Sequence, residues 1–107
     1  MRCMFQGCQS LTKLSLEKFN TKQVTYMNGM FNGCNNLKTI YVSEYNSETN
    51  EGWTTSVVTN SANMFANCIN LVGGNGTTYD SKNIDATYAR IDTTETLGYF
   101  TDVKNKT

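Results

Sequence analysis

A repeat with a fixed period constrains this chain more than any other feature. The segment 4–11 reads Met-Phe-x-Gly-Cys-x-x-Leu and recurs at 30–37, an offset of 26 residues. A third copy, Met-Phe-x-x-Cys-x-x-Leu at 64–71, follows the second by 34 residues, which is the same period plus eight. Such a period indicates stacked units, because one short unit cannot bury its apolar side chains without a neighbour.

The eight extra residues lie between the second and third copies. The segment 44–52 is polar and resembles a loop, and when an insertion is placed there 19–25 aligns with 53–59. We therefore predict a repeat array over residues 1–72, with an insertion near 44–52, followed by a C-terminal cap over residues 73–107.

Each unit is expected to contain a helix followed by a strand. In the middle unit the apolar residues are spaced 3, 3, 1 and 3 apart, which is typical of one helix face: Val24, Met27, Met30, Phe31 and Cys34. Gly33 stands where a left-handed residue commonly ends a helix. The following Leu37-x-x-Ile40-x-Val42 has the alternation of a strand with one buried face. The sequence thus predicts an α/β fold, an LRR-like solenoid of about three strand-turn-helix repeats with a C-terminal capping segment.

A ligand-binding surface is predicted on the outward side of the sheet, since repeat arrays commonly bind through that face. In the predicted strands these positions alternate with the buried ones: Lys13, Ser15, Glu17, Thr39, Tyr41 and Ser43. The simpler alternative is that these six side chains are only solvated strand positions.

Composition excludes several functional classes. The chain has no histidine, the most common general base and metal ligand, and we predict no catalytic residues, no metal site and no cofactor. Nine basic and nine acidic residues give no net charge, so a nucleic-acid partner is not expected. No run of 18 apolar residues is present, and no membrane insertion is expected in this fragment.

The cysteines share one repeat phase at Cys8, Cys34 and Cys68, with Cys3 outside it. Equivalent positions on neighbouring helices would lie about 8–10 Å apart, farther than the ~7 Å that a disulfide tolerates between Cα atoms. We therefore expect free thiols in a core ladder, with a disulfide as the less favoured alternative.

The tail begins where the repeat pattern stops, after Leu71. It carries enough apolar and aromatic residues to cover the open end of the array, and Tyr99-Phe100-Thr101 is expected to form a short strand.

The motif resembles a known family. The pattern M-x-x-M-F-x-G-C-x-x-L-x-x-L-x-L-x-x-F-x-T-x-x-V-T, carried by about the first 70 residues, is similar to the 26-residue repeat of BspA-like bacterial surface proteins. The tail also resembles the capping segment of that family. The resemblance implies an LRR-like fold, a secreted or cell-surface location, a role in adhesion and no catalytic residues.

Two functions follow as expectations. The first is a bacterial surface or secreted module that binds a host or bacterial surface protein or a glycan. The second is a structural spacer or array end without a ligand of its own. The chain begins within a unit, and we expect it to be part of a longer protein and to self-associate through its uncapped N-terminal edge.

Overall fold

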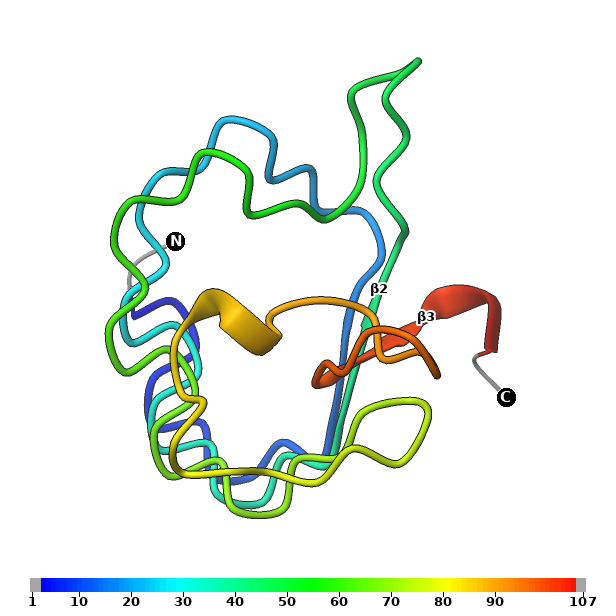
Figure 1. The fold of residues 1–107 in the computed structure, drawn as a ribbon. Coiled ribbons are helices and arrows are strands. Elements are labelled where there is room, and N and C mark those ends of the chain that lie inside the picture. The colour runs from blue at the N-terminus through cyan, green and yellow to red at the C-terminus, as the bar shows by residue number, and fades with distance from the viewer. Residues whose placement is uncertain (1–2, 106–107) are drawn as a thin grey trace.

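The computed structural model describes residues 3–105, and three short parallel strands form its sheet. These are β1 (Lys13–Leu16), β2 (Thr39–Val42) and β3 (Phe100–Asp102), in the order β1-β2-β3. Two 3₁₀ helices, η1 (Ala86–Tyr88) and η2 (Val103–Asn105), lie in the tail. Figure 1 looks along the stack, so that successive coils of the chain overlap around a common interior.

The repeat period becomes the register of the sheet. Leu14 pairs with Ile40 and Leu16 with Val42, so residues one period apart in sequence are neighbours in space. The strands predicted in the first two units are therefore present.

The predicted helix is wrong, and with it the LRR-like strand-turn-helix solenoid. Residues 24–34 contain no α-helix; they form successive tight turns, in which the Met30 N–H donates to the Met27 carbonyl at 3.2 Å and the Cys34 N–H donates to the Phe31 carbonyl at 3.0 Å. Gly29 and Gly33 occupy the third positions of these turns with φ of 67° and 84°, as a type II turn requires.

The other units repeat these two positive-φ positions. In the third unit they are Asn63 and Asn67, at φ of 58° and 66°, and in the first unit they are Cys3 and Gly7, at 56° and 75°. An α-helix has φ near −63° at every residue, so a left-handed residue every four positions excludes one. A turn every four residues brings nearly the same side chains inward as a helix does, which is why the periodicity misled.

The remaining N–H groups join one unit to the next. Phe31 N–H donates to the Met64 carbonyl at 2.8 Å and Gly33 N–H to the Ala66 carbonyl at 2.9 Å. The first unit donates in the same way, from Phe5 to the Met30 carbonyl at 2.8 Å. Coils held by direct backbone hydrogen bonds lie at about the 4.8 Å spacing of strands, roughly half the spacing of packed helices.

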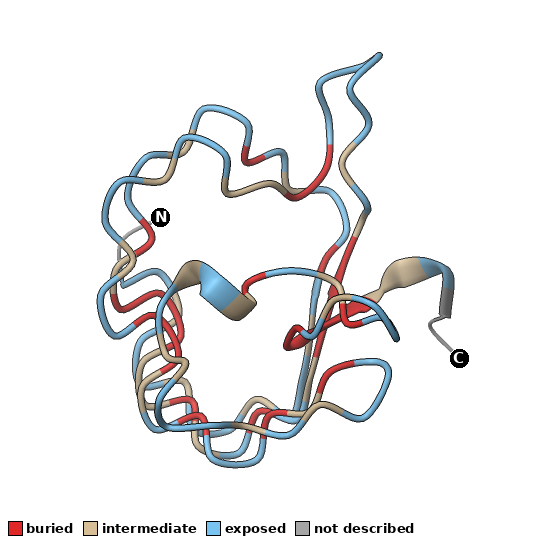
Figure 2. Cartoon of the chain, in the orientation of Figure 1, coloured by how far each residue is buried: buried red, intermediate tan, exposed pale blue. Residues whose placement is uncertain are grey.

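Phenylalanines stack through the core at this short spacing. The rings of Phe5 and Phe31 lie 5.7 Å apart and those of Phe31 and Phe65 lie 5.4 Å apart, with planes within 10° of parallel. Tyr99 and Phe100 from the tail meet the Phe65 ring edge-on. Figure 2 shows the buried residues concentrated along the inner side of the coils.

The tail supplies the third strand. One period beyond β2 and the insertion, the equivalent positions are Gly73, Gly74, Asn75 and Gly76, which favour strands poorly. The chain turns away there, and β3 pairs with β2 instead, Phe100 against Ile40 and Asp102 against Val42. The strand predicted at 99–101 is thus present one residue later.

The cysteines are free, but not for the reason that helix spacing suggested. The thiol of Cys34 donates to the Phe5 carbonyl at 2.9 Å and that of Cys68 to the Phe31 carbonyl at 3.0 Å. Each buried thiol therefore bonds to the backbone of the preceding coil, and contributes to the stack through that contact.

The turn geometry predicts how substitutions at Gly33 behave. We expect Gly33→Ala to lower the free energy of unfolding by about 1–2 kcal/mol, the cost of a left-handed L-residue. Gly33→Asn should cost less than half as much, because asparagine already occupies the equivalent left-handed position at Asn67. Urea unfolding of both variants measures the difference, and an equal loss would contradict the assignment of the turn.

The buried thiols predict a graded reactivity. Burial raises the pKa of the Cys34 thiol, and raises that of Cys68 to about 12. With a disulfide reagent at pH 8 the exposed Cys3 should react fastest, whereas Cys34 and Cys68 should react only after unfolding, since the thiolate is the nucleophile. Titration in denaturant is the control and should find four thiols. Rapid native-state labelling of Cys68 would show that the core does not pack in this way.

Candidate functional site

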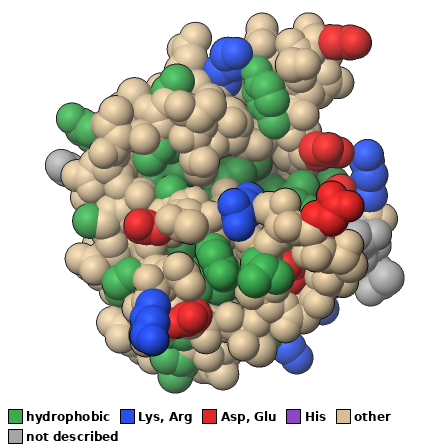
Figure 3. Space-filling model, in the orientation of Figure 1, with side chains coloured by type: hydrophobic (Ala, Val, Ile, Leu, Met, Phe, Trp, Pro, Cys, Tyr) green, Lys and Arg blue, Asp and Glu red, His purple; other side chains and the backbone are tan. Residues whose placement is uncertain are grey.

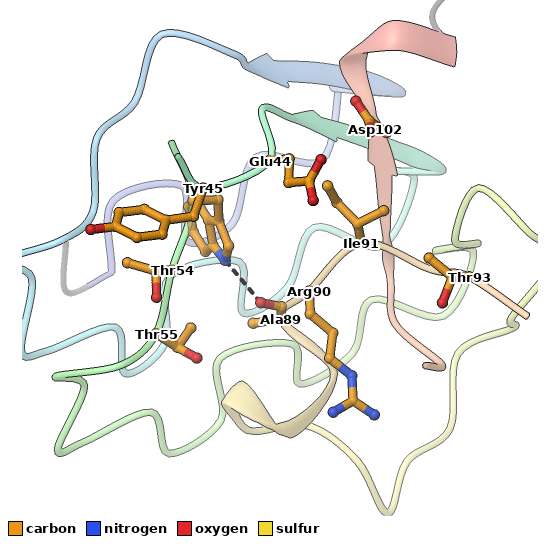
Figure 4. Close-up of a pocket in the computed structure, with 10 residues that line it drawn as sticks. Glu44, Tyr45, Thr54, Thr55, Ala89, Arg90, Ile91, Thr93 and Asp102 are labelled. Atoms are coloured by element: carbon orange, nitrogen blue, oxygen red, sulfur yellow. Dashed lines mark hydrogen bonds between the residues drawn. The ribbon is translucent and has the colours of Figure 1, made fainter. Parts of the chain in front are cut away.

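A recess lies where the insertion meets the tail. It is an open cleft of about 490 Å³, and Figure 4 shows the residues that line it converging from four segments. They are Glu44 and Tyr45 on the outgoing limb of the insertion, Trp53, Thr54 and Thr55 directly after it, Ala89, Arg90, Ile91 and Thr93 in the tail, and Asp102 at the end of β3.

The insertion is a short hairpin that projects from the coil (Figure 1). Asn46 pairs with Glu51 in an antiparallel bridge, and the Asn50 N–H closes the turn on the Asn46 carbonyl at 2.8 Å. At Gly52 φ is 104°, and a Cβ there would lie 2.5 Å from the Glu44 carbonyl oxygen. Glycine at this position lets the returning limb pass close to the outgoing one, which fixes one wall of the cleft.

Trp53 joins the insertion to the tail. Its indole Nε1–H donates to the Ala89 carbonyl at 2.8 Å, and its ring meets Phe100 edge-on with 4.9 Å between centroids. The next residue is held from the other side, where the Thr54 N–H donates to Thr21 Oγ1 and Thr21 Oγ1–H donates to the Thr54 carbonyl, both at 2.7 Å. This wall is therefore preorganised, with its polar groups paired.

Tyr45 is held at the cleft mouth. Its hydroxyl donates to Asn50 Oδ1 at 3.0 Å and accepts from Lys22 Nζ at 3.0 Å, while Lys22 Nζ lies 5.5 Å from the ring centroid. The half-buried ring is thus positioned by two polar neighbours and leaves apolar surface at the rim.

Charges of both signs surround the opening. The Arg90 Nε–H donates to the Leu97 carbonyl at 2.6 Å, and its guanidinium lies 5.6 Å from the Tyr88 ring. Glu44 faces Lys104 at 4.0 Å, with both side chains largely exposed. Figure 3 shows acidic and basic side chains close together on the side where the C-terminal residues lie. Exposed pairs of this kind contribute little to stability and are available to a polar ligand.

Asp92 orders the tail segment that forms the far wall. Its carboxylate accepts from the Thr77 hydroxyl at 2.7 Å and from the backbone N–H groups of Asn75, Thr77 and Gly98 at 2.9–3.2 Å. Burial disfavours the charged form, but these hydrogen bonds outweigh it, and the pKa of Asp92 lies below its ordinary value. One carboxylate therefore ties together two loops and the approach to β3.

The side chains that line the cleft can make polar and aromatic contacts to a ligand. The lining offers two aromatic rings, hydroxyls, one guanidinium and two carboxylates, but no nucleophile beside a general base. Within residues 3–105, no three cysteine, aspartate or glutamate side chains converge as metal ligands would.

The predicted sheet-face residues do not line this cleft. Lys13, Ser15 and Glu17 are exposed, Thr39 and Ser43 are half-buried, and Tyr41 is only 8% exposed.

The tail extends this sheet, because β3 pairs with β2 and the Gly74 N–H donates to the Phe100 carbonyl at 3.3 Å. Ser43 Oγ also donates to the Glu17 carbonyl at 2.8 Å, so its hydroxyl joins the first two coils.

The sequence did carry a signal for the cleft. Insertions in repeat proteins map to loops on one face, often the binding face, and this insertion is the one break in the period. Nothing in the pattern showed that Ala89, Arg90 and Ile91 would fold back against it.

These features define a repeat protein of stacked strand-and-turn coils, closed at one end by its tail. The chain belongs to the family described as Mycoplasma protein of unknown function, DUF285, whose model matches residues 1–98. That match crosses the predicted boundary between array and cap. A BspA-like relationship is not shown by this match.

No curated protein and no solved structure matches the chain. Across the described residues, no helix is long and apolar enough to span a membrane.

The hydrogen bonds to the Asp92 carboxylate predict that stability depends on pH. Because the folded-state pKa of Asp92 is depressed, its stabilisation is present above its unfolded pKa of about 3.9 and is lost as the pH falls through the lower folded value. We expect the stability difference between wild type and Asp92→Asn to shrink steadily below about pH 5. Thermal unfolding from pH 7 to pH 2 measures this, with Glu95→Gln on the same loop as the control. A difference that does not change with pH would argue against an ionised Asp92.

Proposed function

We propose that this chain is an interaction module of a bacterial cell-surface or secreted protein, and that it binds a protein or glycan ligand in the cleft between insertion and tail. The observation that carries the proposal is the preorganised cleft, with Trp53 fixed to Ala89 at 2.8 Å in one wall, Tyr45 at the mouth and exposed charges around the opening. Concave sites with a few fixed polar groups and aromatic side chains are the usual form of binding sites.

The motif similarity to BspA-like surface repeats supports the proposed location and the role in adhesion. The fold implied by that similarity is not retained, because the units contain turns where it expects helices. A cleft built by an insertion into the regular repeat also favours a ligand over a passive spacer, since a spacer needs no break in its period.

Trp53 provides the reporter for a direct test, because it is the only tryptophan in the chain. The chain is titrated with a panel of glycans and of extracellular matrix proteins, and binding is followed by tryptophan emission and by surface capture. We expect the double variant Glu44→Gln/Arg90→Ala to bind at least tenfold more weakly, about 1.4 kcal/mol or more, through loss of two charged contacts.

Two matched variants separate the alternatives. Lys82→Ala removes an exposed charge outside the cleft and should leave binding unchanged. Glu17→Gln tests the sheet face. If this variant loses ligand binding while the cleft double variant binds fully, the ligand site lies on the sheet and not in the cleft. Failure of every ligand in the panel to bind the wild type would favour the spacer.

A further inference from the structure

The ladder that joins the coils has a direction. On the turn side, each coil donates N–H groups to carbonyls of the coil that follows it: Phe5 to Met30 and Gly7 to Asn32, both at 2.8 Å, in the first pair. The second pair repeats this from Phe31 and Gly33. On the turn side the two ends of the stack are therefore chemically different, one offering donors and the other acceptors. Near the strands the bonds run the other way, from the Lys38 N–H to the Thr12 carbonyl and from the Val72 N–H to the Lys38 carbonyl, both at 2.9 Å.

The tail closes the donor end. Phe65 N–H donates to the Ile84 carbonyl at 2.9 Å, and Asn67 N–H donates to the Tyr79 hydroxyl at 3.2 Å. These are the N–H groups that would otherwise reach a fourth coil.

The acceptor end is open. Its carbonyls equivalent to those of Met30 and Asn32 belong to Met4 and Gln6, and within residues 3–105 no donor reaches either one. Met4 is 50% exposed, whereas Met30 and Met64 are fully buried.

The same contrast holds for the rest of the first coil. Four residues of this coil that point toward the core are only partly buried: Phe5, Cys8, Leu11 and Leu14. Their equivalents one period later are fully buried. The exposed side of this coil is thus apolar in its side chains and acceptor-rich in its backbone.

We propose that this N-terminal edge is a docking surface for one more coil of the same repeat, in a single polarity. The incoming coil supplies N–H groups to the Met4 and Gln6 carbonyls and an aromatic ring to stack on Phe5. Its own carbonyl at the phenylalanine position accepts the Cys8 thiol, as the Phe5 carbonyl accepts the Cys34 thiol at 2.9 Å. Each requirement copies a contact that the two internal junctions already make.

The polarity selects against a second copy of this chain as the occupant. Two N-terminal edges facing each other bring acceptor to acceptor on the turn side. A head-to-tail pair needs free donors at Phe65 and Asn67, which the tail occupies. Self-association through this edge, the expectation from sequence, is therefore an outcome that the test must distinguish.

The test duplicates residues 1–26 ahead of the full chain, which keeps the period because Met1 and Met27 are one repeat apart. The cysteines of the added copy are replaced by alanine, so that alkylation of the original Cys8 shows whether the added coil covers it. We expect alkylation of Cys8 to slow at least tenfold and the denaturation midpoint to rise in a single transition.

The matched control carries Phe5→Asp and Gly7→Val in the added copy, which remove the stacking ring and the left-handed turn. Cys8 should there react as fast as in the unmodified chain. Equal alkylation of Cys8 in the duplicated protein and in this control overturns the proposal. So does a dimer of the unmodified chain, found by sedimentation, in which Cys8 is protected.

Discussion

Backbone hydrogen bonds between successive coils set the spacing of the whole stack. Every second N–H of the turn segments leaves its own coil and bonds to the next, while the intervening ones close tight turns. This alternation satisfies the backbone without a helix and sets a short distance between coils. The phenylalanine stack and the thiol-to-carbonyl bonds follow from that distance, because neither would form across the spacing of packed helices.

Each coil of such a ladder is stabilised only by contacts with its neighbours, so the stability of the stack depends on how its two ends are covered. At the C-terminal end the tail supplies a strand, two aromatic rings and acceptors for the last coil. It is held in shape by Asp92, which accepts from both of its loops. The same tail forms one wall of the cleft, and the closure of the stack and the candidate site therefore depend on the same residues.

The cleft shows how a regular repeat acquires a site. Eight inserted residues interrupt the period, and the hairpin that they form has no equivalent in the first unit against which to pack. The residue that follows the hairpin, Trp53, bonds to Ala89 of the tail, and the open space between hairpin and tail is lined by both polar and apolar side chains.

The repeat pattern was enough to predict the period, the place of the insertion, the strands at Leu14–Leu16 and Ile40–Val42, and the inward phase of the phenylalanines and cysteines. These follow from local patterns that any stacked unit must satisfy. The same pattern could not distinguish a helix from successive turns in residues 24–34, because both conformations bring residues three and four positions apart to one side. The paired left-handed positions, at Gly29 and Gly33 and again at Asn63 and Asn67, were the available signal. The tertiary contacts were needed to show that Phe100–Asp102 replaces the glycine-rich third strand and that Ala89 of the tail bonds to Trp53 beside the cleft. Those contacts join residues 36 to 60 positions apart, whose pairing depends on the whole chain having closed around one core.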